Sequence, residues 1–262
     1  MRTTLCLFLA TCTFATANLR VMTNPVTSYT YIRQEHLEIT VSDSEAVLKG
    51  TFRFRYAGTP EEFHRMLGVT LFVPVWFPEQ NRTDPRVTAF WRAFTRNEKN
   101  HITPENSAAF EEALGLRVNI GESPQSIYEF AALTTNAWKG QYSREWKTFQ
   151  TVQEPGFSCL VFEFLRAADL LRKQLPVTIT HRQPLLEAAG GGVFFYCPIF
   201  DRLPARISTL NTNDYVITIK VAPGCSLNGV MGKTSFALES GQTMTLSPQD
   251  HTPILIVSVK KG

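Results

Sequence analysis

The stretch EHLEITVSDSEAVLKGTFRFRY, residues 35–56, decides the fold class of this 262-residue chain. Apolar and polar residues alternate on both sides of a short polar run at 42–45. A period of two is typical of strands with one buried face, and Ser and Asp favour the turn that joins them. The pattern therefore predicts a β-hairpin.

The register of this hairpin also follows from the pattern. Turning about Asp43 and Ser44 places apolar partners opposite each other on one face: Val41 with Ala46, Ile39 with Leu48 and Leu37 with Gly50. Glu38 then meets Lys49 on the other face. A slip of one residue would bury both charges, so we expect a single register.

Further apolar alternation predicts strands on both sides of the middle third, at 65–77, 159–164, 177–180, 193–199, 215–221 and 253–259. Pro74 should end regular pairing or mark a bulge. The runs 236–238 and 244–246 flank Ser240 and Gly241, which predicts a bulged hairpin. The three glycines at 190–192 predict a flexible loop before a strand.

Between residues 84 and 140 the apolar period changes from two to between three and four. Three helix-start signals, each an N-cap residue followed by proline, occur at 84–85, 103–104 and 123–124. Gly115 and Gly140 suit the ends of the second and third helices. The pattern predicts about three helices here, and a further short helix within 167–175.

Strands, then helices, then strands indicate a mainly β protein of the α+β class. We expect antiparallel β-sandwich-like layers, interrupted by about three helices in the middle third. The simplest organisation is a single β-rich domain at 18–262 with a helical insertion at 78–156. The alternative is two domains, 18–150 and 157–262.

Residues 1–17 resemble a secretory signal peptide. Arg2 is the single charge, an apolar or small stretch follows, and residues 15–17 fit a small-x-small cleavage site. No later segment is long and apolar enough to span a membrane. We expect a secreted, periplasmic or cell-envelope protein. Cys12 leaves open a lipid-anchored envelope protein.

Three cysteines remain after the first 17 residues: Cys159, Cys197 and Cys225. In an oxidising compartment an odd number suggests one disulfide and one free thiol, with three pairings open. Cys159 and Cys197 each lie in a predicted strand, which favours that pair.

The composition excludes several classes of function. The net charge is +3, or +2 without Arg2, and this balance argues for neither nucleic acid nor an anionic surface as the partner, so we expect no nucleic acid. The five histidines are isolated, and the chain has no His-Glu-x-x-His and no Gly-x-Ser-x-Gly motif. We expect no catalytic, metal or cofactor-binding residue that is recognisable from a motif.

Aromatic residues are unevenly distributed, since all four tryptophans lie between residues 76 and 146. Trp76 follows an apolar run between two prolines, and Tyr142 and Trp146 lie in a polar run, four residues apart. Half-exposed aromatic rings beside polar groups suit a sugar ring, a peptide or a partner protein. These three residues are the candidate contact residues.

The opening hairpin, with its apolar strand, polar turn, Gly50 and Phe52-x-Phe54, resembles the first β-domain of the zinc aminopeptidases. The resemblance covers about 25 residues, a pattern that many sandwiches share. The chain lacks the zinc-binding helix motif of that family, so the resemblance implies a β-domain and no activity.

These observations favour a secreted or envelope protein without catalytic function, which acts through protein or surface-ligand contacts. The competing hypothesis is an extracellular hydrolase whose site is assembled from distant residues around the aromatic middle segment.

Overall fold

The computed structural model describes residues 20–24, 30–56, 58–66, 68–78, 112, 114–126, 129–132, 157–166, 169–188, 191–196, 215–231, 234–246 and 255–261. Within them the protein is mainly β, with two short helices, so the expected α+β class is confirmed.

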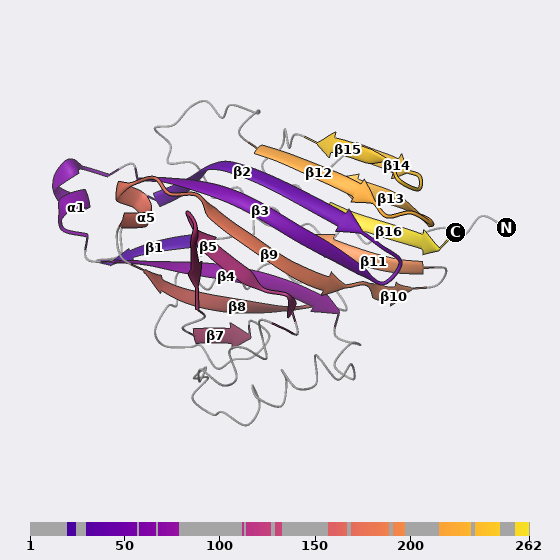
Figure 1. The fold of residues 1–262 in the computed structure, drawn as a ribbon, viewed down its shortest axis with the longest axis horizontal. Coiled ribbons are helices and arrows are strands. Elements are labelled where there is room, and N and C mark those ends of the chain that lie inside the picture. The colour runs from indigo at the N-terminus through magenta and orange to yellow at the C-terminus, as the bar shows by residue number, and fades with distance from the viewer. Residues whose placement is uncertain are drawn as a thin grey trace, which may run out of the picture.

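The largest sheet has seven strands in the order β15-β12-β2-β3-β9-β5-β6, and it faces the viewer in Figure 1. Its strands are β2 (Thr30–Val41), β3 (Glu45–Tyr56), β5 (Arg117–Ile120), β6 (Ser123–Gln125), β9 (Val177–Pro184), β12 (Tyr215–Val221) and β15 (Thr243–Leu246).

The predicted hairpin is present as β2 and β3, and its register is the predicted one. Val41 lies opposite Ala46, Ile39 opposite Leu48, Leu37 opposite Gly50 and Glu38 opposite Lys49. Ser42 closes the turn, because its backbone N–H and its hydroxyl both donate to the carbonyl oxygen of Glu45, at 2.9 Å each. Alternation and turn chemistry agree here, so local sequence suffices to specify the pairing.

Gly50 is required by the packing of its own strand. A Cβ at this position would lie 2.5 Å from the ring of Phe52, which covers the glycine on the buried face. Ile39 and Leu48, in the next row, are 0% and 1% exposed. The aromatic ring thus fills the volume that the glycine leaves in the sheet.

A second sheet has five strands in the order β10-β11-β16-β13-β14. They are β10 (Leu186–Ala188), β11 (Gly191–Tyr196), β13 (Cys225–Met231), β14 (Thr234–Leu238) and β16 (Leu255–Lys261). Leu227, Phe236 and Val257 of this sheet belong to the same core cluster as Ile39 and Ile219 of the seven-stranded sheet. The two sheets therefore share one hydrophobic core.

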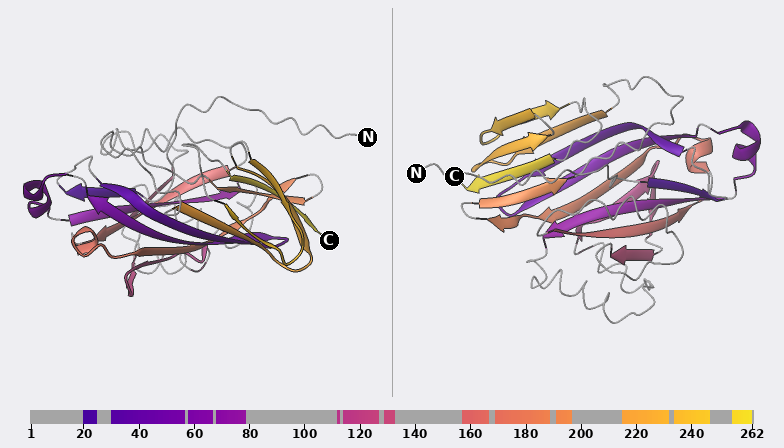
Figure 2. Two further views of the ribbon diagram at one scale, coloured as in Figure 1. Left: turned by 90° about the horizontal axis from the view of Figure 1, so that it is seen from above. Right: turned by 180° about the vertical axis from the view of Figure 1, so that it is seen from behind.

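The third sheet has four strands in the order β1-β4-β8-β7, and it lies behind the seven-stranded sheet (Figures 1 and 2). Its strands are β1 (Arg20–Asn24), β4 (Gly68–Pro78), β7 (Glu129–Ala132) and β8 (Phe157–Arg166). Leu71 and Val73 of β4 are 0% and 2% exposed, as expected for a central strand.

Two short helices flank the sheets at one end of the molecule. Helix α1 (Pro60–His64) starts at Thr59, and Thr59 and Glu62 form a reciprocal capping box. Helix α5 (Asp169–Arg172) lies within the predicted helical region 167–175.

The prediction of a third helix in the middle third is wrong, because residues 123–125 and 129–132 are strands. Gly121, with φ of 60°, turns the chain back so that β6 pairs with β5, while β7 pairs with β8. Sheet pairing overrides the local Ser-Pro signal. Pro124 is tolerated because β6 is the end strand of its sheet among the described residues, where a missing N–H leaves no described partner unpaired.

The other two expected helices have different outcomes. The first, which starts at residue 84, lies outside the described residues. For the second, Glu112 and Leu114 are helical, and Gly115 follows with φ of 55°, as expected for a glycine that ends a helix.

The bulged hairpin expected around Gly241 is wrong. Strand β14 pairs with β13 and β15 pairs with β12, so the turn at 239–242 carries the chain from one sheet to the other. Phe236 and Leu246 still face the same core cluster, which explains why their alternation imitates a hairpin. A further departure is β12, which runs parallel to β2.

Pro74 neither ends nor shifts the pairing of β4, because it lies opposite Val161 in an unbroken register with β8. Strand β1 pairs with β4 only as far as Phe72. Beyond that point one edge of β4 has no partner strand among the described residues, so a missing N–H is tolerated there.

The flexible loop expected at residues 190–192 is wrong for Gly191 and Gly192, which form the start of β11. A Cβ at Gly191 would collide with the carbonyl oxygen of Val259. Glycine is needed here for close approach of two strands.

Candidate functional site

The three aromatic residues expected to contact a ligand are not brought together in the described part of the chain. Trp76 lies in β4, where its backbone is opposite Cys159 of β8. Tyr142 and Trp146 lie outside the described residues. Their role as contact residues stays a prediction.

The expected disulfide also stays a prediction. Cys159 lies in β8, whereas Cys197 is outside the described residues. Cys225 is a free thiol, 5% exposed, in the core between two sheets.

The outer face of the seven-stranded sheet carries a concentration of positive charge. Strand β3 contributes three exposed cations to it, because every second residue from Lys49 faces outward: Lys49, Thr51, Arg53 and Arg55. Six residues of strand separate Lys49 from Arg55, which is about 20 Å. We call the set Arg33, Lys49, Arg53, Arg55, Arg117 and Arg182 the basic strip.

At one end of the basic strip, three cations surround Thr180 of β9. Lys49 of β3 and Arg117 of β5 lie directly opposite Thr180 on its two neighbouring strands. Arg182 is two residues further along β9 and faces the same side. Its side chain crosses toward β5, since a Cβ on Gly115 would lie 2.7 Å from its Nε.

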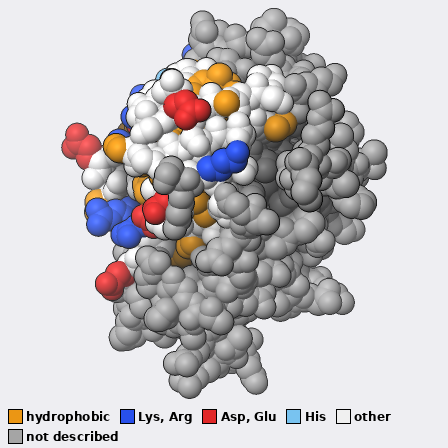
Figure 3. Space-filling view, turned by 90° about the vertical axis from the view of Figure 1, so that its right-hand side faces the viewer, with side chains coloured by type: hydrophobic (Ala, Val, Ile, Leu, Met, Phe, Trp, Pro, Cys, Tyr) orange, Lys and Arg blue, Asp and Glu red, His pale blue; other side chains and the backbone are white. Residues whose placement is uncertain are grey.

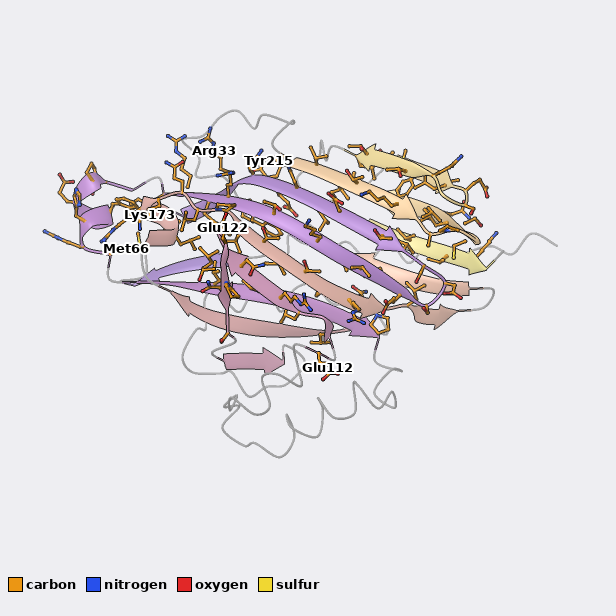
Figure 4. The ribbon with its side chains drawn as sticks, in the orientation of Figure 1. Arg33, Met66, Glu112, Glu122, Lys173 and Tyr215 are labelled. Atoms are coloured by element: carbon orange, nitrogen blue, oxygen red, sulfur yellow. The ribbon has the colours of Figure 1, made fainter. Side chains whose placement is uncertain are left out.

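The other end of the basic strip is built on a β-bulge. The register of β2 and β3 shifts between Ile32 and Gln34, so Arg33 is the extra residue and is exposed. The carbonyl oxygen of Ile32 accepts a hydrogen bond from the buried Tyr215 hydroxyl at 2.6 Å. Figure 4 shows Arg33 and Tyr215 at this same end of the sheet. A bulge re-aims a side chain, and here it leaves Arg33 exposed next to Gln34, which lies opposite Arg53.

Little of this charge is neutralised within the face. The described strand residues that point outward include two carboxylates, Glu38 and Glu45. Glu38 forms an ion pair with Lys220 at 2.9 Å, and this hydrogen bond is the main reason why its pKa is lowered. Lys49 lowers that pKa only through its charge, with no direct contact. The Glu38 carboxylate is thus committed to Lys220, which lies outside the basic strip.

The buried polar side chains of β9 supply no negative charge either. His181 and Gln183 of β9 point inward and are 7% and 0% exposed. His181 Nδ1 and both polar atoms of the Gln183 amide have no hydrogen-bond partner among the described residues. Burial lowers the pKa of His181 to about 4, so its imidazole is neutral at pH 7.

The described residues contain no group of three His, Cys, Asp or Glu side chains that could hold a metal ion. Among the same residues, no helix is long and apolar enough to cross a membrane. Figure 3 shows the end of the molecule at which β14 and β15 lie, where described basic, acidic and hydrophobic side chains are interspersed. The described charges at this end are thus of both signs, unlike the excess of cations on the outer sheet face.

Sequence reasoning missed the basic strip, although part of its signal was present. The run from Lys49 to Arg55 alternates between basic or hydroxyl residues and Gly or Phe, which predicts cations on the face opposite the core. Arg117 and Arg182 had no such signal. They join Lys49 only because β9 lies between β3 and β5.

Comparison with known proteins gives little further information. No protein-family model matches the chain, and no curated protein matches it. Among solved structures, an aminopeptidase N family protein from Idiomarina loihiensis is similar with 12% sequence identity and a TM-score of 0.26. The match covers 85% of this chain and 29% of that protein. A likeness this weak carries no argument about fold or function.

Proposed function

We propose that the chain is an exported protein without catalytic function, which acts by binding an anionic partner through the outer face of its seven-stranded sheet. The observation that supports this proposal is the basic strip, in which six exposed cations share one face with two outward-pointing strand carboxylates, Glu38 and Glu45, while Glu122 lies in the turn between β5 and β6. Interspersed charges of both signs would be enough to keep the protein soluble, so solubility alone does not explain an excess of cations on one face.

The sequence-based argument against an anionic partner rests on net charge, and net charge averages over the whole molecule. A field of one sign over one face raises the local concentration of oppositely charged partners and their rate of association. The strip is exposed, so its attraction reaches about 8 Å at physiological ionic strength. Binding through this face should therefore weaken as salt is added.

Retention of the full chain on sulfonate beads, compared with neutral beads, tests the proposal. We expect retention on the sulfonate beads at low salt and its loss in the double variant Arg117→Glu/Arg182→Glu. The matched control is Arg65→Glu/Lys260→Glu, which makes the same change in net charge at exposed positions outside the face. Equal loss of retention in both variants would show that net charge, and not the face, is responsible.

We also propose export by the signal peptide at 1–17, the Cys159–Cys197 disulfide and sandwich-like layering of the sheets. The mature N-terminus tests the first of these: Asn18 supports cleavage after residue 17, a modified Cys12 supports a lipid anchor, and an intact Met1 argues against both. Peptide mass spectrometry without reduction tests the disulfide, and three free thiols would exclude it.

A further inference from the structure

The basic strip is long, and its cations gather at its two ends. Lys49, Arg117 and Arg182 surround Thr180 at one end, and Arg33, Arg53 and Arg55 lie at the bulge at the other. Along β3 the two ends are about 13 to 20 Å apart. One small anion can contact one end, whereas a chain of repeated anionic groups can contact both.

We propose that the partner is a linear acidic polysaccharide, sulfated or carboxylated, that lies along β3 and contacts both ends of the basic strip at once. This inference rests on the proposed function and names the chemistry of the ligand. Each end then raises the effective concentration of anionic groups at the other, so the polymer binds more tightly than its isolated anionic group.

The groups between the two ends suit a sugar. Thr51 of β3 and Thr178 of β9 lie opposite each other, and Gln34 and Asn119 face the same side. Hydroxyl and amide groups both donate and accept hydrogen bonds, as the hydroxyls of a polysaccharide do. A sugar chain held by its charges at two points would lie across these groups.

Two other polyanions fit this face less well. Single-stranded nucleic acid binds with successive bases stacked on aromatic rings. The outward residues of β3, β9 and β5, along which the strip runs, include no Phe, Tyr or Trp, and Tyr31 of β2 lies opposite Arg55 at one end. A peripheral membrane protein inserts large exposed apolar side chains. The described apolar residues of this face are Val47, Pro184 and Val216, which are partly buried, and Pro124 of the end strand β6, which is exposed.

Calorimetric titration of the full chain with heparin, a sulfated polysaccharide, tests the inference. Long heparin fragments should bind at least tenfold more tightly than a disaccharide from the same polymer. The variants Arg53→Gln/Arg55→Gln and Arg117→Gln/Arg182→Gln each remove charge from one end. Each variant should weaken the binding of long fragments at least tenfold. The disaccharide should still bind at the end of the strip that is unchanged.

Four outcomes would overturn the inference. Equal affinity for disaccharide and long fragment would show that a single end suffices. Tighter binding of single-stranded DNA, or of vesicles rich in anionic phospholipid, than of heparin would assign the face to that partner instead. Retention on sulfonate beads without any heparin binding would reject the polysaccharide and leave the proposed function standing. Failure of both assays would reject both proposals.

Discussion

A neutral histidine in the core makes the fold sensitive to acid at one residue. Burial holds the pKa of His181 at about 4, below its ordinary value of 6.5. The unfolded chain therefore binds more protons than the folded one between these values, so stability falls as pH decreases from 6.5 toward 4. A shift of this size corresponds to about 3 kcal/mol of unfolding free energy.

Chemical denaturation at pH 7.5 and at pH 4.5 measures this loss. The variant His181→Gln keeps a polar side chain of similar size and cannot titrate, so the difference between the two pH values should shrink by about 2 to 3 kcal/mol. An unchanged pH dependence in this variant would show that other groups cause the acid sensitivity.

Gly50 illustrates how one residue serves the packing of another. In Gly50→Ala the new methyl group would lie 2.5 Å from the ring of Phe52, and we expect a loss of about 1 to 3 kcal/mol from overpacking. Replacing the ring removes the collision. The double variant Gly50→Ala/Phe52→Leu should therefore lose less than the sum of the two single variants in denaturant unfolding. Strict additivity would contradict the contact.

At the level of elements, the end of helix α5 carries local strain. Gln174 follows the helix with φ of 50°, the one non-glycine residue with positive φ in the described chain, and its N–H donates to the Leu171 carbonyl at 3.3 Å. Glycine adopts this conformation without steric cost. Gln174→Gly should raise the free energy of unfolding by about 0.5 to 1 kcal/mol, measured by denaturant unfolding.

The neighbouring position provides the control for this substitution. Lys173 has no positive φ, so Lys173→Gly should lower stability, because glycine there only adds freedom to the unfolded chain. Gln174→Gly keeps the carbonyl that accepts from Arg53 at 3.4 Å, so it should leave the basic strip intact. A loss of stability in Gln174→Gly would contradict the strain.

Elements that local sequence specifies were predicted well, and elements that depend on distant partners were not. The β2–β3 hairpin follows from alternation and a polar turn, down to the pairing of Glu38 with Lys49. Strand β7 could not be recognised, because its four residues are extended only through pairing with β8. The predicted turn before β15 is present, but the apolar alternation on its two sides does not show that β14 and β15 join different sheets.

The same distinction applies to the candidate site. The outward alternation of Lys49, Arg53 and Arg55 can be read from one strand. The contribution of Arg117 and Arg182 depends on the strand order β3-β9-β5, in which sixty residues separate the sequence of β5 from that of β3. Net charge hides such a site, because opposite charges elsewhere cancel it in the sum.

For the whole molecule, a face with an excess of positive charge has an energetic consequence besides binding. Like charges on neighbouring strands repel, and the repulsion is present only in the folded state, where the sheet holds them together. Neutralising part of the basic strip should therefore stabilise the protein. We expect Arg55→Gln/Arg117→Gln/Arg182→Gln to gain about 1 kcal/mol at low ionic strength, even though it weakens binding to an anionic partner.

Thermal unfolding at 0.01 M and 1 M salt provides the measurement, because the Debye length falls from about 30 Å to about 3 Å between these conditions. The gain in melting temperature should be present at low salt and fade at high salt. Lys220→Gln is the control on the same face: it removes a cation that has a carboxylate partner at 2.9 Å, so it should bring no gain. If the triple variant is instead less stable at both salt concentrations, the arginines hold the fold together through their packing, and their exposure on one face is then no sign of a binding role.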